Sequence, residues 1–425
     1  MANIYLPRRR LLQLGAGTFA ATVLSQLFGE RSAGAVTPVS PPKAAGPAKS
    51  LIVLWMAGGP SHLDTFDPKP GTTTGGPFKA IKTKAKGVSI SEHLPQIADQ
   101  AHHLAFLRGM STKEGNHVRA RYLMHTGYAP NPTVIHPSLG AWVSEELGDK
   151  NAELPDFVSI NGPSVGAGFL GVQSGPFFVR KAGNAPDNSR FAANVTDARF
   201  EARRAALDAM EAGFEADTGD AMVHGRRAVL AQTVRMMRSP KLSRFSIDDE
   251  PEALKKAYGD SDFGRGCLLA RRLIESGTRV VEVVLDGWDT HKNNFEAVKA
   301  KSQVLDPGFA TLLKDLETRK LLDSTMVVWM GDFGRTPKIN GNEGRDHYPQ
   351  AWSAVVGGGG LRGGIALGET DAEGIKVVKD KTSPNDLMAT LVTRMGIDPS
   401  KSFNTPLGRP ISITDGGTPL KALVG

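Results

Sequence analysis

The chain lacks paired cysteines and has no long apolar segment. Its 425 residues include one cysteine, Cys267, which excludes an intrachain disulfide and any metal cluster held by several thiolates. No apolar stretch has the length and composition of a transmembrane helix, which needs about 20 such residues. With 40% hydrophobic and 22% charged residues, the composition is that of a globular protein and not of a disordered or collagen-like one. Any chemistry must therefore use carboxylates, imidazoles, hydroxyls, amines or guanidinium groups.

A concentrated block of basic residues is also missing. The formal net charge is +7, but residues 1–35 hold four arginines and only one acidic residue, so much of the excess lies there. The densest basic run elsewhere alternates within a Gly- and Thr-rich segment, a pattern typical of a solvated surface; it consists of Lys79, Lys82, Lys84 and Lys86. We therefore expect no nucleic-acid partner.

The N-terminal residues have the pattern of an export signal. Arg-Arg-x-Leu-Leu-Gln at residues 8–13 precedes a mildly apolar stretch, and Ala-Gly-Ala at residues 33–35 offers a small-x-small cleavage site. The motif is similar to the twin-arginine signal, and an ordinary secretory signal is the alternative. We predict a signal peptide over residues 1–35, cleaved after Ala35, and a Pro/Ala-rich linker over residues 36–50. The mature protein would then be periplasmic or extracellular, without a stable membrane span, and the twin-arginine machinery would be a partner.

Three apolar runs predict buried strands. They cover residues 51–56, 279–285 and 325–330, and each is largely unalternated, as expected for strands covered on both faces of a sheet. Apolar residues recur with helical period over residues 266–276 and 309–322. Alternating strands and helices predict a three-layer α/β/α sandwich with a mostly parallel central sheet.

We expect residues 51–425 to form a single domain. Residues 161–250, rich in Gly, Arg and Ala, are predicted to form an insertion or cap over the functional site. Glycines at 357–360 and 363–364 predict a flexible loop, and the absence of a following Lys-Ser/Thr argues against a phosphate-binding loop. His102 and His103 are expected to be packed or surface histidines.

Carboxylates and imidazoles follow each of the three predicted strands. In a doubly wound sheet, functional sites form just beyond the carboxyl ends of the strands, so these side chains are expected to meet. The candidate metal ligands are Asp64, Asp289, His291, Asp332 and His347. Oxygen and imidazole donors without thiolates suit one or two divalent ions, with Zn, Mn or Ca the best candidates.

Two arginines lie beside these candidates. Arg335 and Arg345 could recognise a tetrahedral anion through paired hydrogen bonds, while paired metal ions hold a phosphoryl or sulfuryl oxygen. The alternative is that Asp289 and Asp332 only cap a helix or turn and that the histidines make local hydrogen bonds.

Several motifs together resemble a known bacterial exported family, the domain of unknown function 1501. The motifs lie at residues 8–13, 58–70, 264–277, 287–291 and 331–337. That family is similar to the alkaline phosphatase and sulfatase superfamily, and residues 383–398 resemble the closing helix of sulfatases. The resemblance implies an alkaline-phosphatase-like fold and a metal-dependent hydrolase that acts on a phosphate or sulfate ester.

The resemblance also assigns individual residues. Asp289, His291 and His347 match one metal site, and Asp332 matches the acidic ligand of the other. Phe333 stands where the superfamily usually has a further histidine ligand. The first strand normally ends in a metal-binding Asp, but this chain has Ala57-Gly58 there, which leaves Asp64 or His62 as the substitute.

The nucleophile position departs most from the superfamily pattern. Nine residues before the helix-ending Thr126-Gly127, where relatives place Ser, Thr or a modified Cys, this chain has His117. His117 could be an additional metal ligand, a general acid or base, or a nucleophile. It could also be only a polar helix start in a non-catalytic member that binds an extracellular glycan, an anion or a protein partner.

Overall fold

The computed structural model describes residues 46–183, 185–218 and 222–424. The predicted signal peptide over residues 1–35 and most of the predicted linker lie outside these ranges, so both stay predictions. None of the helices in the described ranges combines the length and the apolarity that a bilayer span requires.

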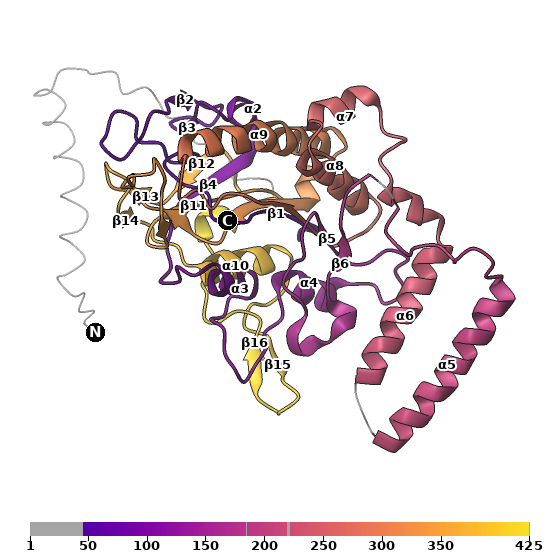
Figure 1. Cartoon of the computed structure of the whole chain (residues 1–425). Helices are drawn as coiled ribbons and strands as arrows, with labels where there is room; N and C mark the ends of the chain where they lie inside the picture. Colours follow the sequence, from indigo (N-terminus) through magenta and orange to yellow (C-terminus); the bar gives the residue numbers. More distant parts are fainter. Residues whose placement is uncertain (1–45, 184, 219–221, 425) are drawn as a thin grey trace, which may run out of the picture. The chain divides into compact units, whose positions relative to one another are not determined.

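A central sheet of eight strands is the main feature of the fold (Figure 1). The strands are β1 Ser50–Met56, β4 Leu104–Met110, β5 Phe157–Ile160, β6 Phe177–Val179, β7 Val280–Leu285, β8 Thr325–Gly331, β11 Trp352–Gly358 and β12 Ile365–Leu367. They lie in the order β12-β4-β11-β8-β1-β7-β5-β6. Among the described residues, β11 alone runs antiparallel to its neighbours, so the predicted mostly parallel sheet is confirmed.

Four short ladders lie outside the central sheet in the described residues. They pair β2 Ala80–Lys82 with β3 Ser89–Ser91, β9 Gly334–Arg335 with β10 His347–Tyr348, β13 Glu369–Thr370 with β14 Val377–Lys379, and β15 Ser402–Asn404 with β16 Pro410–Ser412.

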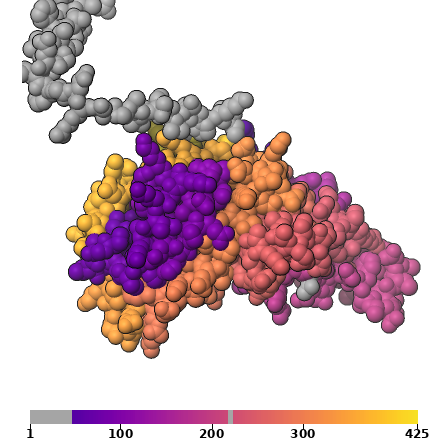
Figure 2. Space-filling model, turned by 90° about the horizontal axis from the view of Figure 1, so that it is seen from above, coloured from indigo at the N-terminus to yellow at the C-terminus, as the bar shows by residue number. Residues whose placement is uncertain are grey.

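Helices cover both faces of the central sheet, which completes the predicted three layers. One face carries α2 Pro95–Gln100, α7 Glu252–Tyr258, α8 Asp262–Glu275 and α9 Asn294–Thr318. The other carries α3 His117–Thr126, α4 Leu139–Leu147, α10 Pro384–Arg394 and α11 Lys421–Val424. Figure 2 shows the first layer from above, with the indigo segment that contains α2 beside the orange α9.

The strand β1 shows why the sheet needs both layers. All seven of its residues are buried, and successive side chains enter opposite cores. Ile52 and Leu54 pack under α8 and α9, whereas Val53 and Trp55 pack toward α4 and α10. Each fully buried aliphatic side chain contributes about 1.5–3 kcal/mol relative to exposure. A one-sided sheet would leave half of this strand in water.

Most predicted elements are confirmed, with shifted boundaries. The three predicted strands are β1, β7 and β8. The predicted helix over residues 309–322 is α9, which instead begins at Asn294, continues through Pro307 and ends at Thr318. Buried apolar residues along its whole length, from Val298 to Leu316, hold the longer helix against the sheet.

The predicted insertion over residues 161–250 contains both sheet and helix. Its strand β6 pairs with β5 and so belongs to the central sheet. Two long helices follow, α5 Asp197–Thr218 and α6 Met222–Arg238, and α6 packs against the 3₁₀ turn Val172–Ser174. Its role as a cap over the functional site stays a prediction.

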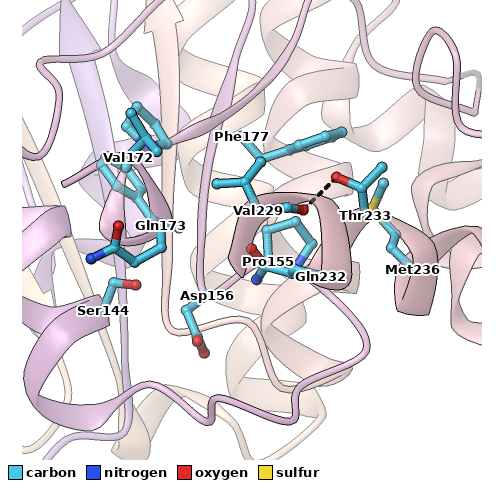
Figure 3. A pocket seen from close by; sticks show the side chains of 13 residues that line it. Ser144, Pro155, Asp156, Val172, Gln173, Phe177, Val229, Gln232, Thr233 and Met236 are labelled. Atoms are coloured by element: carbon cyan, nitrogen blue, oxygen red, sulfur yellow. Dashed lines mark hydrogen bonds between the residues drawn. The ribbon is translucent and has the colours of Figure 1, made fainter. Parts of the chain in front are cut away.

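A cavity of about 90 Å³ lies between α6, this 3₁₀ turn and the start of β5. Figure 3 shows its lining side chains, which include Phe177, Val229, Met236 and the carboxyl group of Asp156. Burial raises the pKa of Asp156 to about 6, although a backbone N–H of Asp149 and the nearby charge of Arg279 act in the opposite direction.

This carboxyl group makes stability depend on pH. Because its pKa is higher in the folded state, the protonated form stabilises the fold at low pH, and this contribution is lost as the pH rises through about 6. We expect Asp156→Asn to raise the melting temperature at pH 8 and to leave it nearly unchanged at pH 4. Melting curves of both proteins across this range measure the difference, with Asp323→Asn, an exposed carboxylate, as the control. An equal shift at both pH values would contradict the expectation.

Candidate metal centre

Parallel pairing brings the three predicted strand ends together. β1 lies between β7 and β8 and is parallel to both, so their carboxyl ends share one edge of the sheet. Gly58, just beyond β1, has φ of 105°, and a Cβ at this position would lie 2.5 Å from the backbone nitrogen of Asp289. The absence of a side chain at Gly58 therefore allows the loops after β1 and β7 to touch.

Three imidazoles converge on one carboxylate oxygen at this edge. His117 begins α3, His291 follows β7, and His347 lies in β10. Their Nε2 atoms lie 3.3, 3.0 and 3.3 Å from Asp289 Oδ1, in that order. The Nε2 atoms of His291 and His347 are 3.0 Å apart.

The opposite ring nitrogen of each imidazole has its own acceptor. The Nδ1 pairs are His117 with Asp332 Oδ2 at 2.7 Å, His291 with Asp346 Oδ1 at 2.7 Å, and His347 with the Gly115 carbonyl oxygen at 2.9 Å. Carboxylate and carbonyl oxygens only accept, so in the neutral rings Nδ1 carries the proton and Nε2 presents a lone pair. Three lone pairs and a carboxylate oxygen directed at one another repel unless a cation lies among them. The donor set therefore fits a divalent metal ion.

Arg335 holds the carboxylate in place. Its Nη2 lies 2.5 Å from Asp289 Oδ1, and the guanidinium also donates to the carbonyl oxygens of Gly58 and Gly59. Burial acts to raise the pKa of Asp289, but the charge and hydrogen bond of Arg335 outweigh it and lower that pKa. Arg335 is fully buried and uses its donors on the protein, so this arrangement supports a positioning role in place of the predicted anion recognition.

Asp332 lies next to the cluster, on the side of the His117 ring that points away from Asp289. Its Oδ2 accepts from His117 and from the backbone N–H of Gly58 at 3.0 Å. The hydrogen bond to Asp332 raises the pKa of His117, against the effect of burial. The sequence predicts Asp332 as a metal ligand; in the structure its Oδ2 pairs with the Nδ1 of His117, and its role as a ligand stays a prediction.

The predicted ligand Asp64 is in another place. It is fully buried and accepts from Arg345 through both oxygens, Nε to Oδ2 at 2.7 Å and Nη2 to Oδ1 at 3.2 Å. Asn294 donates a third hydrogen bond at 2.9 Å. Arg345 uses its remaining donors on backbone carbonyls, including that of Thr74. As a correction, Asp64 and Arg345 form a buried ion pair and are not available as a metal ligand and an anion-binding group.

Phe333 closes the other side of the cluster. Its ring centroid lies 4.8 Å from that of His117, nearly stacked, and 4.8 Å from that of His347. An apolar ring thus covers the side of the cluster that lies next to His117 and His347. Near these rings, the described residues offer one group of converging donors, in which ligand atoms of His117, Asp289 and His347 lie within 4.8 Å of one another.

Two hydrogen-bond acceptors of the imidazoles are not among the site residues that the sequence predicts. Asp346 contacts His291 from 55 positions away, and the Gly115 carbonyl contacts His347 from 232 positions away. The sequence offers one local signal for Asp346, since it directly precedes His347. Nothing in the sequence marks a backbone carbonyl as a partner.

The fold and the cluster define an α/β/α protein with a candidate metal centre at the carboxyl edge of its sheet. Residues 48–424 match the model of a family described as "Protein of unknown function (DUF1501)", and the chain belongs to this family, as the sequence predicts. A comparison with curated proteins finds no match.

Similar solved structures include a synthase, a sulfatase and a protein described as a member of the alkaline phosphatase superfamily. The lipoteichoic acid synthase LtaP from Listeria monocytogenes is 10% identical, with 88% of this chain and 76% of that chain covered and a TM-score of 0.38. The PsFucS1 sulfatase from Pseudoalteromonas sp. is 10% identical, with coverage of 82% and 68% and a TM-score of 0.38. A protein in the alkaline phosphatase superfamily from Vibrio parahaemolyticus is 12% identical, with coverage of 84% and 68% and a TM-score of 0.37. These scores and identities do not indicate the activity of this chain.

The acceptors behind the imidazoles are expected to tune metal affinity. Replacing such a partner typically weakens binding by about 10–100-fold, so we expect this loss for Asp332→Asn and for Asp346→Asn. Zinc titration against a competing chelator measures it. His136→Gln is the control, because its ring is bonded to Tyr122 and lies outside the cluster. Unchanged affinity in both Asn variants would contradict the proposed tautomers.

The buried ion pair is expected to serve stability alone. Asp64→Asn leaves Arg345 charged and buried without its partner, which should lower the free energy of unfolding by about 3–5 kcal/mol. Urea unfolding measures this loss, and metal analysis of the same protein should show unchanged metal content. Loss of the metal with unchanged unfolding would restore Asp64 as a ligand.

Proposed function

We propose that the protein is a metal-dependent hydrolase of phosphate or sulfate esters, with one divalent ion held by His117, Asp289, His291 and His347. The observation that carries the proposal is the convergence of three Nε2 atoms on Asp289 Oδ1. Nitrogen and oxygen donors in this combination suit Zn first, and Mn next.

Exposure of the cluster favours a catalytic over a purely structural ion. The side chains of His117, Asp289, His291 and His347 are 31%, 46%, 41% and 30% exposed. Structural zinc sites are closed, whereas catalytic sites keep one position open. An anionic ester or a glycan ester could therefore approach the donors from solvent. When bound, a divalent ion at such a site polarises an ester oxygen and lowers the pKa of a water molecule.

The chain's own residues orient this centre. Asp332, Asp346 and the Gly115 carbonyl fix the orientation of the three rings, so that the Nε2 atoms face Asp289. Arg335 fixes the Asp289 carboxylate and offsets its charge. The fully buried ring of Phe333 packs against His117 and His347 and covers one side of these two rings.

Three roles are open for His117: metal ligand, general acid or base, and nucleophile. The geometry supports the first of them. Its Nε2 faces the same oxygen as the other two rings, and its Nδ1 is already bonded to Asp332. In the described part of the chain, no hydroxyl or thiol is hydrogen-bonded to the four donor side chains. We therefore propose that water attacks the ester directly, without a covalent intermediate on the protein.

One second function has an observation in its favour. Phe333 replaces a ligand and His117 replaces the nucleophile of catalytic relatives. A non-catalytic protein that uses its metal centre to bind an extracellular glycan, an anion or a protein partner would share these features. Turnover separates the two proposals.

We also propose export to the periplasm or the cell exterior. The support is the twin-arginine-like motif at residues 8–13 and the small-residue site that ends at Ala35, both outside the described residues. The export machinery would then be a partner of the unprocessed chain.

Hydrolysis of aryl phosphates and aryl sulfates tests the main proposal. We expect metal-dependent turnover that a chelator removes and zinc restores, and we expect His347→Gln to fall to the background rate while His136→Gln keeps its activity. Protein denatured in alkaline detergent during turnover should carry no phosphate, because water attacks directly; alkaline conditions preserve a phosphoryl group on a histidine nitrogen. Phosphate trapped on His117 would make it a nucleophile. A metal-loaded protein without turnover on either substrate class would favour the binding function.

A further inference from the structure

A second group of imidazoles and a carboxylate lies away from the candidate metal centre. His102 and His103 form part of the 3₁₀ turn Ala101–His103, between α2 and β4, and Glu317 lies in the last turn of α9. One ligand atom from each of the three lies within 4.8 Å of the others. His103 Nε2 is 3.3 Å from Glu317 Oε1, and the two imidazole centroids are 3.9 Å apart.

This group occupies the opposite edge of the sheet. β4 and β8 both run antiparallel to β11 and therefore point in the same direction. The two histidines directly precede β4, and Glu317 lies shortly before β8, so all three sit at the amino edge of these strands. The candidate metal centre lies at the carboxyl edge. The two groups therefore share no residue.

The glycine-rich segment after β11 fixes the backbone of the two histidines. A Cβ on Gly357 would lie 2.5 Å from the carbonyl oxygen of His103, and one on Gly363 would lie 2.6 Å from that of His102. The N–H of Gly364 donates to the carbonyl oxygen of Leu104 at 2.8 Å. The sequence predicts a flexible loop here, but in the structure Gly357 belongs to β11 and the glycines pack tightly against the histidine turn. The imidazoles therefore project from a constrained backbone.

The donors at this group have few other partners. His103 Nε2 is buried and makes no hydrogen bond of acceptable geometry within the described residues, although it faces the Glu317 carboxylate. Burial and the neighbouring His103 lower the pKa of His102, while the charge of Glu317 and a hydrogen bond to the Asp99 backbone act to raise it. The nearby Lys84 also lowers this pKa, and its own charge is paired with Asp99 at 3.7 Å. The Glu317 side chain is 54% exposed, so the group is open to solvent.

We propose that His102, His103 and Glu317 bind a divalent transition-metal ion, with Zn²⁺ preferred, at a second site independent of the candidate metal centre. Two imidazole nitrogens and one carboxylate oxygen are a zinc donor set that leaves a coordination position for water. The ion would link the start of β4 to the end of α9 and stabilise the folded state by mass action.

Zinc stoichiometry of the full chain, measured by calorimetric titration, tests this site. We expect two zinc ions per wild-type chain, one in His103→Gln or Glu317→Gln, one in His347→Gln, and none in the combination of Glu317→Gln with His347→Gln. His224→Gln, which alters an exposed histidine beside Glu215, should keep both ions. Circular dichroism checks that each variant is folded, and Glu317→Gln, at an exposed side chain, replaces His103→Gln if the latter unfolds.

A second readout does not depend on counting ions. Zinc should raise the melting temperature of His347→Gln, in which only the second site remains, and should not raise that of the double variant. Equal zinc binding by wild type, His103→Gln and Glu317→Gln would overturn the proposal. A single zinc that is lost in Glu317→Gln and kept in His347→Gln would instead overturn the candidate metal centre and leave the second site standing.

Discussion

Parallel pairing of β1 with β7 on one side and β8 on the other is the constraint on which the candidate centre depends. It places the ends of the three strands side by side, although the first of them, Met56, and the last, Gly331, are more than 200 residues apart in the chain. The close contact at Gly58 then brings two of the following loops together. Three of the four converging donors reach this edge from segments that follow β7 and β8, and α3 supplies the fourth.

Charge at this edge is arranged in two groups. Asp289 and the three imidazoles are partly exposed, Asp332 and Arg335 are buried behind them, and Asp346 lies exposed beside His291. In the neutral rings, Asp332 and Asp346 set which nitrogen of His117 and His291 carries the proton, and the buried guanidinium offsets the charge of Asp289. Asp64 and Arg345 form a separate pair deeper in the protein, where a neutral ion pair with satisfied hydrogen bonds avoids an isolated buried charge.

The two groups of donors also show how one sheet can support sites at both edges. At the carboxyl edge, loops of several residues allow side chains to gather around an open position. At the amino edge, the donors come from a 3₁₀ turn and a helix end held by close glycine packing. The second arrangement has fewer ligands. Its physical consequence would be local stiffness and not catalysis.

Local patterns in the sequence determined the fold class, the three strands, the family and most of the donors. The spacing of apolar residues along the chain indicates buried strands and amphipathic helices. Asp-x-His and Gly-Asp motifs mark the ends of strands. Only the tertiary structure decided which carboxylate faces the open position and which supports a ring. Asp64, Asp289 and Asp332 each follow one of the three strands, and their surroundings differ because Arg345, Arg335 and His117 reach them from distant segments. Packing between distant segments sets these pairings, and the spacing of residues within one segment does not show which distant side chain will reach it.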